Sequence, residues 1–234
     1  MVGRTPWSAA APLVGSVGSL SHCGENFTTP SHYFGVMIHQ RRLPHIWATG
    51  QPVFLTWRLH GSLPPHRPFA GGTLPSGQAF AALDRLLDEA RTGPFYLRQP
   101  VLADMVVEAV WYNAQILRHY GLHAFVVMPN HVHSLVTAEV PLPKLTKSLK
   151  GITAKRANAM LTLTGEPFWQ EESYDHVVRH EREFQTIRSY IEENPVRARL
   201  VRRASQYRWS SAGWATGGSP ADQGVRPTMD PPLL

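Results

Sequence analysis

The chain has 234 residues, of which 43% are hydrophobic and 17% are charged, and this balance excludes an intrinsically disordered protein. Its formal net charge of +6 is compatible with a nucleic-acid partner, because phosphate neutralisation supplies much of the affinity for nucleic acids. The single cysteine, Cys23, excludes an internal disulfide and a thiolate metal cluster. The sequence has no apolar run long enough for a membrane span and no convincing signal peptide, so we expect a cytoplasmic protein.

The two ends of the sequence differ from its middle. Residues 1–36 are rich in Ser, Gly, Thr and Pro and show no hydrophobic period, and residues 213–234 are rich in Gly, Pro and Asp. We expect both segments to be disordered extensions. One hypothesis is that translation of the natural protein starts at Met37, which mass spectrometry can test. The predicted single domain then covers residues 37–212.

The first predicted elements are a strand and two helices. Residues 53–60 are rich in apolar, aromatic and β-branched residues between glycines and predict a strand. Apolar residues recur at helical spacing from Ser76 and predict a helix that Gly93 and Pro94 end. A longer helix is expected to begin at about Pro100, with Gly121 as its C-cap.

The second half of the domain predicts two more strands and two more helices. Residues 123–128 and 131–137 are short apolar runs around a Pro-Asn dipeptide and predict strands joined by a tight connection. A basic amphipathic helix is expected over about 144–163, extended chain over 168–179, and a helix over 181–193 that stops at Asn-Pro. These elements predict an α+β sandwich, a small antiparallel sheet with helices packed on it.

Two histidines, His131 and His133, lie two positions apart in a predicted strand. Alternate residues of a strand share one face of the sheet and stand about 7 Å apart, twice the rise per residue. Two imidazoles placed in this way can converge on one divalent cation such as Mn2+ or Zn2+. Taken alone, the spacing favours the ordinary interpretation of chance, because the chain contains 12 histidines.

The last predicted helix carries a tyrosine and an asparagine on one side. Tyr190 and Asn194 are four residues apart, so they lie one turn from each other at the edge of the apolar stripe. At that edge a tyrosine can pack its ring and still present its oxygen. Each residue also has an ordinary interpretation, Tyr190 as an amphipathic boundary residue and Asn194 as a helix C-cap. The stripe itself consists of Phe184, Ile187 and Ile191.

Four segments of the sequence form a recognisable series. They read VMPNHVHS at 127–134, FWQ with YDHVVR at 168–179, SYIEENPVR at 189–197 and YRWSS at 207–211. In this order they resemble the MPNHxH strand, the segment after it, the YIxxNP helix end and the Trp-Ser-Ser closure of single-tyrosine transposases of the His-x-His class. Among these enzymes the REP-associated tyrosine transposases of bacteria are the most similar. Four motifs in register, spread over roughly 43–211, are far more specific than any one of them.

This resemblance implies a ferredoxin-like domain whose central sheet carries the histidine pair and whose late helix brings the catalytic tyrosine against it. Carried over by position, His131 and His133 are ligands of Mg2+ or Mn2+, and Tyr190 is the nucleophile. Asn194 takes the place of a third polar ligand that some relatives supply as Gln. Because Asn is one methylene shorter, it binds the metal either directly or through a water.

A second tyrosine competes for the role of nucleophile. Tyr174 lies in apparently extended chain, with Asp175 and His176 beside it. Tyr190 is favoured because it has a candidate ligand one helical turn away. His176 is either a second-shell partner or a surface residue.

Basic residues mark a candidate surface for DNA. The cations of the predicted helix 144–163 have no acidic residue among them, and a stripe of Leu145, Leu149, Ile152 and Ala159 is expected to be buried opposite them. Such a helix either follows a DNA backbone or is an ordinary solvated face, and the two interpretations weigh about evenly. The candidate DNA-binding residues are Lys144, Lys147, Lys150, Lys155, Arg156 and Arg197.

The sequence therefore predicts a transposase that cleaves and rejoins single-stranded DNA through a 5′-phosphotyrosine, with a divalent metal. The resemblance implies hairpin-forming repeat ends as the DNA partner and either a monomer or a homodimer. Two other functions stay open: a metal-dependent phosphodiesterase that uses water, and a catalytically idle nucleic-acid-binding protein. Zn2+ also stays open as the metal, because two histidines tolerate it equally.

Overall fold

The computed structural model describes residues 37–40, 44–47, 49–63, 76–89 and 93–216. The expected extension at 1–36 and most of the one at 213–234 lie outside these described residues, as does Cys23.

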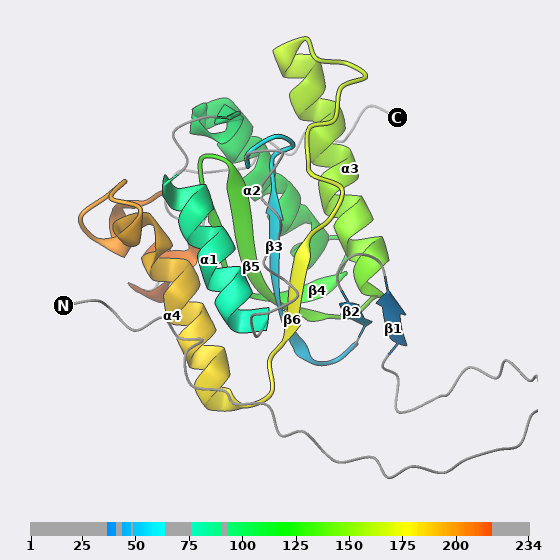
Figure 1. Ribbon diagram of the computed structural model, residues 1–234, viewed down its shortest axis with the longest axis vertical. Coiled ribbons are helices and arrows are strands. Elements are labelled where there is room, and N and C mark those ends of the chain that lie inside the picture. Colours follow the sequence, from blue (N-terminus) through cyan, green and yellow to red (C-terminus); the bar gives the residue numbers. More distant parts are fainter. Residues whose placement is uncertain (1–36, 41–43, 48, 64–75, 90–92, 217–234) are drawn as a thin grey trace, which may run out of the picture.

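One four-stranded antiparallel sheet organises the described chain (Figure 1). Its strand order is β4-β5-β3-β6, so β5 and β3 are central. A separate two-stranded sheet pairs β1 with β2. The strands are β1 (Met37–Gln40), β2 (Pro44–Trp47), β3 (Pro52–Arg58), β4 (Tyr120–Val127), β5 (His131–Ala138) and β6 (Tyr174–Val177).

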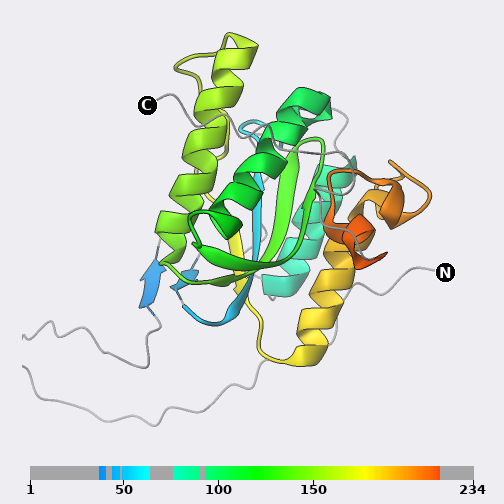
Figure 2. The ribbon, with the colours of Figure 1, turned by 180° about the vertical axis from the view of Figure 1, so that it is seen from behind.

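Helices cover both faces of this sheet. α2 and α3 lie on one face, and α1 and α4 lie on the other, as the two opposite views show (Figure 1 and Figure 2). Short 3-10 helices precede α2 and follow α4. The helices are α1 (Ser76–Glu89), α2 (Pro100–Gln115), α3 (Leu142–Leu161) and α4 (Glu181–Arg197), with η1 (Tyr96–Arg98), η2 (Ala204–Gln206) and η3 (Ser211–Thr216).

The order of elements confirms the predicted α+β class and its ferredoxin-like core. The series β3-α2-β4-β5-α3-β6 is a β-α-β-β-α-β unit, in which β5 lies antiparallel between β3 and β4. The two helices of this unit, α2 and α3, share one face. α1 and α4 are therefore additions on the opposite face, which the unit alone would leave uncovered.

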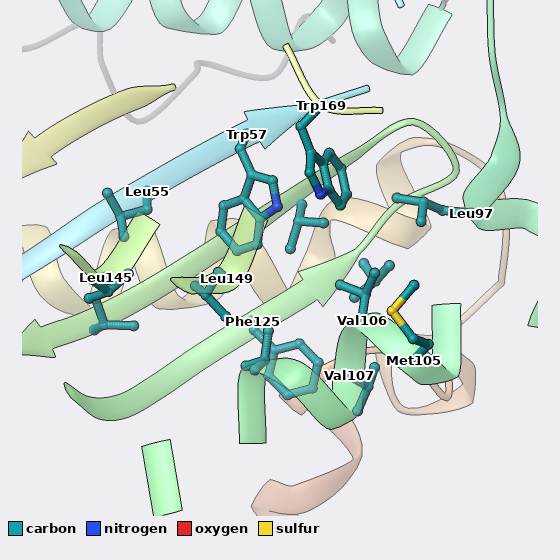
Figure 3. Packing of buried hydrophobic residues seen from close by; sticks show 14 of the residues in the cluster. Leu55, Trp57, Leu97, Met105, Val106, Val107, Phe125, Leu145, Leu149 and Trp169 are labelled. Carbon is teal, nitrogen blue, oxygen red and sulfur yellow. The ribbon is translucent and has the colours of Figure 1, made fainter. Parts of the chain in front are cut away.

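The face under α2 and α3 is packed with apolar side chains (Figure 3). Trp57 of β3 and Phe125 of β4 are buried there against residues such as Val106 and Leu149 from the two helices. The Trp57 ring meets Trp169 edge-on, with 6.3 Å between ring centroids. Because helices cover both faces, the central strands are buried along nearly their whole length.

Two predicted helix ends were wrong. Gly121 is not the C-cap of α2, because it lies in β4 opposite Thr137, and Arg118 takes the left-handed conformation after the helix (φ 51°). α4 does not stop at Asn194, because it continues through Pro195 to Arg197, and Ala198 is its C-cap. A proline removes one hydrogen bond from the last turn but leaves the turns before it intact, so the helix ends just beyond the Asn-Pro pair.

The predicted buried stripe of α3 was right at its start and wrong further on. Leu145 and Leu149 are buried, but Ile152 is 42% exposed, and Ala159 is exposed as well. Thr153 and Ala157 are buried in their place. The buried residues Leu145, Leu149, Thr153 and Ala157 are spaced by four, so they form one row along the side of α3 that packs on the sheet.

Candidate metal and nucleophile site

The two histidines of the His-x-His motif lie on the middle strand β5 and face α1 and α4. Both are fully buried, and Val132 between them points into the opposite apolar core. Their rings are 4.6 Å apart, and the two Nε2 atoms are separated by 3.0 Å. The structure thus brings the predicted pair together as the strand geometry requires.

The turn before β5 fixes the orientation and the tautomer of His131. The Asn130 amide nitrogen donates to the Leu87 carbonyl at 3.0 Å, so its oxygen faces His131 Nδ1 at 2.7 Å. An amide oxygen only accepts, and Nδ1 must therefore carry the hydrogen. Burial, together with His133, lowers the pKa of His131 to about 3. The ring is consequently neutral at physiological pH and presents the Nε2 lone pair.

His133 is held by a residue of the neighbouring strand. Its Nδ1 lies 2.7 Å from Thr56 Oγ1, and Thr56 is the partner of His133 in the pairing of β3 with β5. This bond leaves Nε2 pointing toward His131. Hydrogen bonds at the second ring nitrogen commonly set the orientation of metal-binding histidines.

A carboxylate that the sequence analysis missed completes this group. Asp84 of α1 is buried, and its Oδ1 lies 2.9 Å from His133 Nε2 and 3.6 Å from His131 Nε2. Burial would raise the pKa of Asp84, but the two histidines and Arg197 lower it below the usual value. The signal in the sequence was an Asp placed between Phe80 and Leu87 on the apolar side of a predicted helix.

Tyr190 lies on α4 with its hydroxyl at this cluster. The hydroxyl donates a short hydrogen bond to Asp84 Oδ2. The ring is 6.0 Å from the His133 ring, and it also has edge contacts with Phe54 and Phe80. Tyr190 is only 6% exposed. It is therefore deeper than the predicted boundary position, because α1 covers the side of α4 that a helical projection left open.

Local sequence and a stacked arginine hold Tyr190 in place. α4 begins with His180, whose ring accepts a hydrogen bond from the Glu183 backbone N–H, and acidic residues occupy its first turn. Arg197, two turns after Tyr190, stacks its guanidinium 3.7 Å above the ring and donates to the Tyr190 carbonyl at 3.0 Å. The cation thus contacts the candidate nucleophile itself.

Asn194 faces the same cluster from one turn further along α4. It is fully buried, its amide nitrogen lies 3.4 Å from Asp84 Oδ2, and its Oδ1 has no hydrogen-bond partner. Its C-cap interpretation was wrong, because it lies inside the helix. A buried amide oxygen without a partner is costly, and a cation is one partner that would satisfy it.

The rival Tyr174 lies on a strand that β3 separates from the strand of the histidine pair. It is on β6 at the sheet edge, and its ring stacks on Phe80 with 4.5 Å between centroids. His176 forms an ion pair with Glu183 at 2.9 Å. Tyr190 contacts the Asp-His-His cluster directly, because its hydroxyl donates to Asp84.

The predicted basic residues fall into two separate groups. Those on α3 lie on the sheet face opposite the histidines. Lys144, Lys147 and Lys155 are exposed there, and Arg156 pairs with Glu108 at 3.2 Å. Lys150 is half-buried and donates to the Gln170 and Glu171 carbonyls, each at 2.7 Å, and burial lowers its pKa to about 8. Only Arg197 lies at the candidate site.

The donor set fits a divalent cation. Two ligands at neighbouring corners of an octahedron with metal–ligand bonds of about 2.1 Å are about 3.0 Å apart. The His131–His133 and His133–Asp84 separations of 3.0 and 2.9 Å match that edge, and the His131–Asp84 separation of 3.6 Å is longer than it. Asp84, His131 and His133 form the one group of this kind in the described residues. Imidazole and carboxylate together suit Mn2+ and also Zn2+.

Comparison with protein families gives a match. A family model described as "Transposase IS200 like" matches residues 98–194, from the start of α2 to Asn194. Curated proteins contain no match. The matched region, which is similar to this family, holds both histidines and Tyr190.

Solved structures show more distant likenesses. One is a REP-associated tyrosine transposase bound to a REP hairpin, at 18% identity and a TM-score of 0.47, covering 82% of this chain and 89% of that chain. Another, from Deinococcus radiodurans R1, is described as an inferred transposase, at 21% identity and a TM-score of 0.33, covering 68% and 98%. Among the helices of the described residues, none has the length and apolar character that crossing a membrane requires.

Proposed function

We propose that this protein is a transposase that cuts and rejoins single-stranded DNA with Tyr190 as nucleophile, next to a divalent metal held by His131, His133 and Asn194. The observation that carries the proposal is the meeting of three elements at one buried point. β5 supplies the histidine pair, α4 supplies the tyrosine, and α1 supplies the carboxylate between them.

The protein's contribution to the metal is orientation and charge. Asn130 and Thr56 hold the two rings so that both Nε2 atoms face the same point. A Mg2+ or Mn2+ ion bound there supplies positive charge beside a phosphate oxygen and stabilises the charge that develops during attack. The partnerless Asn194 oxygen supports its place in the ligand set.

Tyr190 supplies the nucleophilic oxygen. A free tyrosine, with a pKa near 10, is a weak nucleophile at neutral pH, so its environment must assist it. The Tyr190 Oη–phosphorus bond forms as the phosphorus–O3′ bond breaks, the phenolic proton is lost and the 3′-oxygen gains one. The products are a 5′-phosphotyrosine and a 3′-hydroxyl. Because one phosphodiester replaces another, the 3′-hydroxyl can reverse the step without a nucleotide triphosphate.

The direct test is covalent trapping. We would incubate the protein with labelled single-stranded DNA from the ends of its own gene neighbourhood, with and without Mn2+, and look for a denaturation-resistant adduct. The proposal expects a metal-dependent adduct that is lost in Tyr190→Phe and retained in Tyr174→Phe. The Tyr174 variant is a matched control, because this tyrosine lies on the same face of the sheet and also packs against Phe80.

The other outcomes each contradict the proposal in a different way. Cleaved DNA without an adduct would indicate a phosphodiesterase that uses water. Binding without cleavage would indicate an idle nucleic-acid-binding protein. An adduct that survives in Tyr190→Phe but disappears in Tyr174→Phe would reassign the nucleophile.

We propose hairpin-forming repeat ends as the natural DNA. The solved structure of a REP-associated relative contains a REP hairpin, and that partner is carried over here only as a hypothesis. The exposed cations of α3 are candidates for backbone contacts with DNA, in keeping with the basic charge of the chain. A hairpin from the gene's flanks should compete for binding more strongly than a scrambled strand of equal length.

A further inference from the structure

Asp84 stands at the centre of the cluster and uses its two oxygens differently. Oδ1 faces the imidazole nitrogens, at 2.9 Å from His133 and 3.6 Å from His131. Oδ2 accepts the short hydrogen bond of the Tyr190 hydroxyl and lies 3.4 Å from the Asn194 amide nitrogen. One carboxylate therefore contacts every candidate catalytic side chain of the site.

A buried carboxylate at this position calls for a functional explanation. Asp84 is 3% exposed, and its helix neighbours on the same side, Phe80 and Leu87, are buried apolar residues. Burying an acid costs several kcal/mol unless charge and hydrogen bonds compensate it. Among the described residues, only the two histidine Nε2 atoms lie within ion-pair distance of its Oδ1. That oxygen is the one aimed between the rings.

We propose that Asp84 is a bridging positioning residue: its Oδ1 serves as a further protein ligand of the metal, and its Oδ2 holds the Tyr190 hydroxyl beside that metal. The inference rests on the proposed function and adds to it a residue from α1, which lies outside the region 98–194 that matches the family. Metal binding and placement of the nucleophile are then coupled through one side chain. Occupation of the metal site changes the surroundings of the Tyr190 ring.

Asp88, one helical turn after Asp84, provides the matched control. It is on the same helix and partly buried, and burial with the nearby Asp84 raises its pKa to about 8. At neutral pH it is protonated, so Asp88→Asn replaces a neutral acid with a neutral amide of the same shape. The same exchange at Asp84 removes a charge from the proposed ligand set.

The first measurement is Mn2+ affinity by titration calorimetry on the full chain. We expect Asp84→Asn to weaken Mn2+ binding by about 10- to 100-fold or more, because loss of an outer-shell partner alone has an effect of that size. Asp88→Asn should leave Mn2+ binding unchanged. Asp84→Glu, which keeps the carboxylate, should retain more affinity than Asp84→Asn. If Asp84→Asn binds Mn2+ as tightly as the wild type while His133→Ala does not bind, the bridging role is overturned.

The second measurement reports on the coupling without any DNA. The protein is labelled with fluorotyrosine, and the Tyr190 resonance is assigned by its loss in Tyr190→Phe. Adding Mg2+ should shift this resonance in the wild type and in Asp88→Asn, and should leave it in place in Asp84→Asn at saturating Mg2+. If Mg2+ shifts the Tyr190 resonance equally in Asp84→Asn, the proposal is overturned. This conclusion does not depend on the Mg2+ affinity of the variant, because the comparison is made at saturating Mg2+.

These results separate the inference from the proposed function. Wild-type protein that forms the metal-dependent adduct, combined with unchanged metal binding in Asp84→Asn, refutes the bridge and leaves the transposase proposal standing. Wild-type protein that binds Mn2+ through Asp84 but forms no adduct refutes the proposed function and leaves the metal ligand standing.

Discussion

The two faces of the sheet are built from different kinds of side chain. Under α2 and α3 the buried groups are apolar, with neutral polar residues such as Asn113 and Thr153 that bond to nearby backbone carbonyls. Under α1 and α4 the strands instead carry two imidazoles against a carboxylate. The first face is a hydrophobic core that stabilises the fold. The second surrounds a polar cluster with buried apolar side chains such as Phe54, Met128 and Leu135. Substitutions of the polar cluster and of the first core should therefore separate chemistry from stability.

The largest expected effect lies on the polar face. His133→Ala should lower adduct formation by more than about 100-fold. Loss of an outer-shell partner of a metal lowers activity by about 10- to 100-fold, and this variant removes a proposed ligand itself. Thermal stability without metal should also fall, because the substitution removes the buried partner of Asp84 and Thr56, so cleavage is compared per folded molecule. Single-turnover cleavage and calorimetry would measure the two quantities. A large loss of stability with normal cleavage per folded molecule would break the comparison.

The apolar face should behave in the opposite way. Phe125 is fully buried in the core shown in Figure 3. Phe125→Ala should lower the free energy of unfolding by about 3–5 kcal/mol, from lost burial and the cavity left behind. Denaturant titration measures this loss. Below the unfolding transition, the Mn2+ affinity of the folded fraction should match that of the wild type, and a selective loss of affinity would contradict the division of roles.

A smaller effect is expected at Asn130, which touches the polar cluster only through His131. Asn130→Ala removes the acceptor that fixes the His131 tautomer. Mn2+ affinity should fall by about 10- to 100-fold, as for other second-shell partners. The same substitution at Asn113, which lies on the apolar face, is the control and should leave Mn2+ affinity unchanged.

The last prediction concerns the pH dependence of stability. Burial and Asp84 raise the pKa of Asp88 from 3.8 to about 8, so unfolding releases its proton between these values. A raised folded-state pKa of an acid means that its contribution to stability is full below about pH 4 and is lost as pH rises toward 8. The stability of Asp88→Asn relative to the wild type should therefore grow across this window. If the difference in unfolding free energy between Asp88→Asn and the wild type stays constant from pH 4 to 8, the Asp88 carboxyl is solvated in the folded protein.

The sequence was sufficient where one short segment carries the information. The strand runs, the helix periods and the His-x-His spacing each depend on local geometry, and the structure confirms the α+β core that they predict. Asp84 was missed because its role depends on α1 meeting β5 from a distant part of the chain. The full burial of Tyr190 and the stacking of Arg197 on its ring were missed for the same reason. The roles of these residues in catalysis stay predictions.

Helix ends were harder to predict than helix existence. Pro195 was taken as a stop, although a proline in the last turn removes only one hydrogen bond, and the helix has three residues after Asn194. Ile152 and Ala159 fit a helical period of α3 but not its actual line of contact with the sheet. Packing partners, rather than the pattern of one helix, decide which of several similar apolar stripes is buried.

The depth of Tyr190 has a consequence for the kinetics of the protein. Its hydroxyl is engaged by Asp84, its ring lies under Arg197, and both histidines are fully buried. For the proposed attack by Tyr190, a side chain or a helix of the α1–α4 layer would have to move aside before a DNA phosphate could reach this oxygen. The apparent affinity for a cleavable strand is then the intrinsic affinity multiplied by the population of open molecules. Cleavage should accordingly saturate at a rate set by opening, and loosening the α1–α4 contact should accelerate the first turnover.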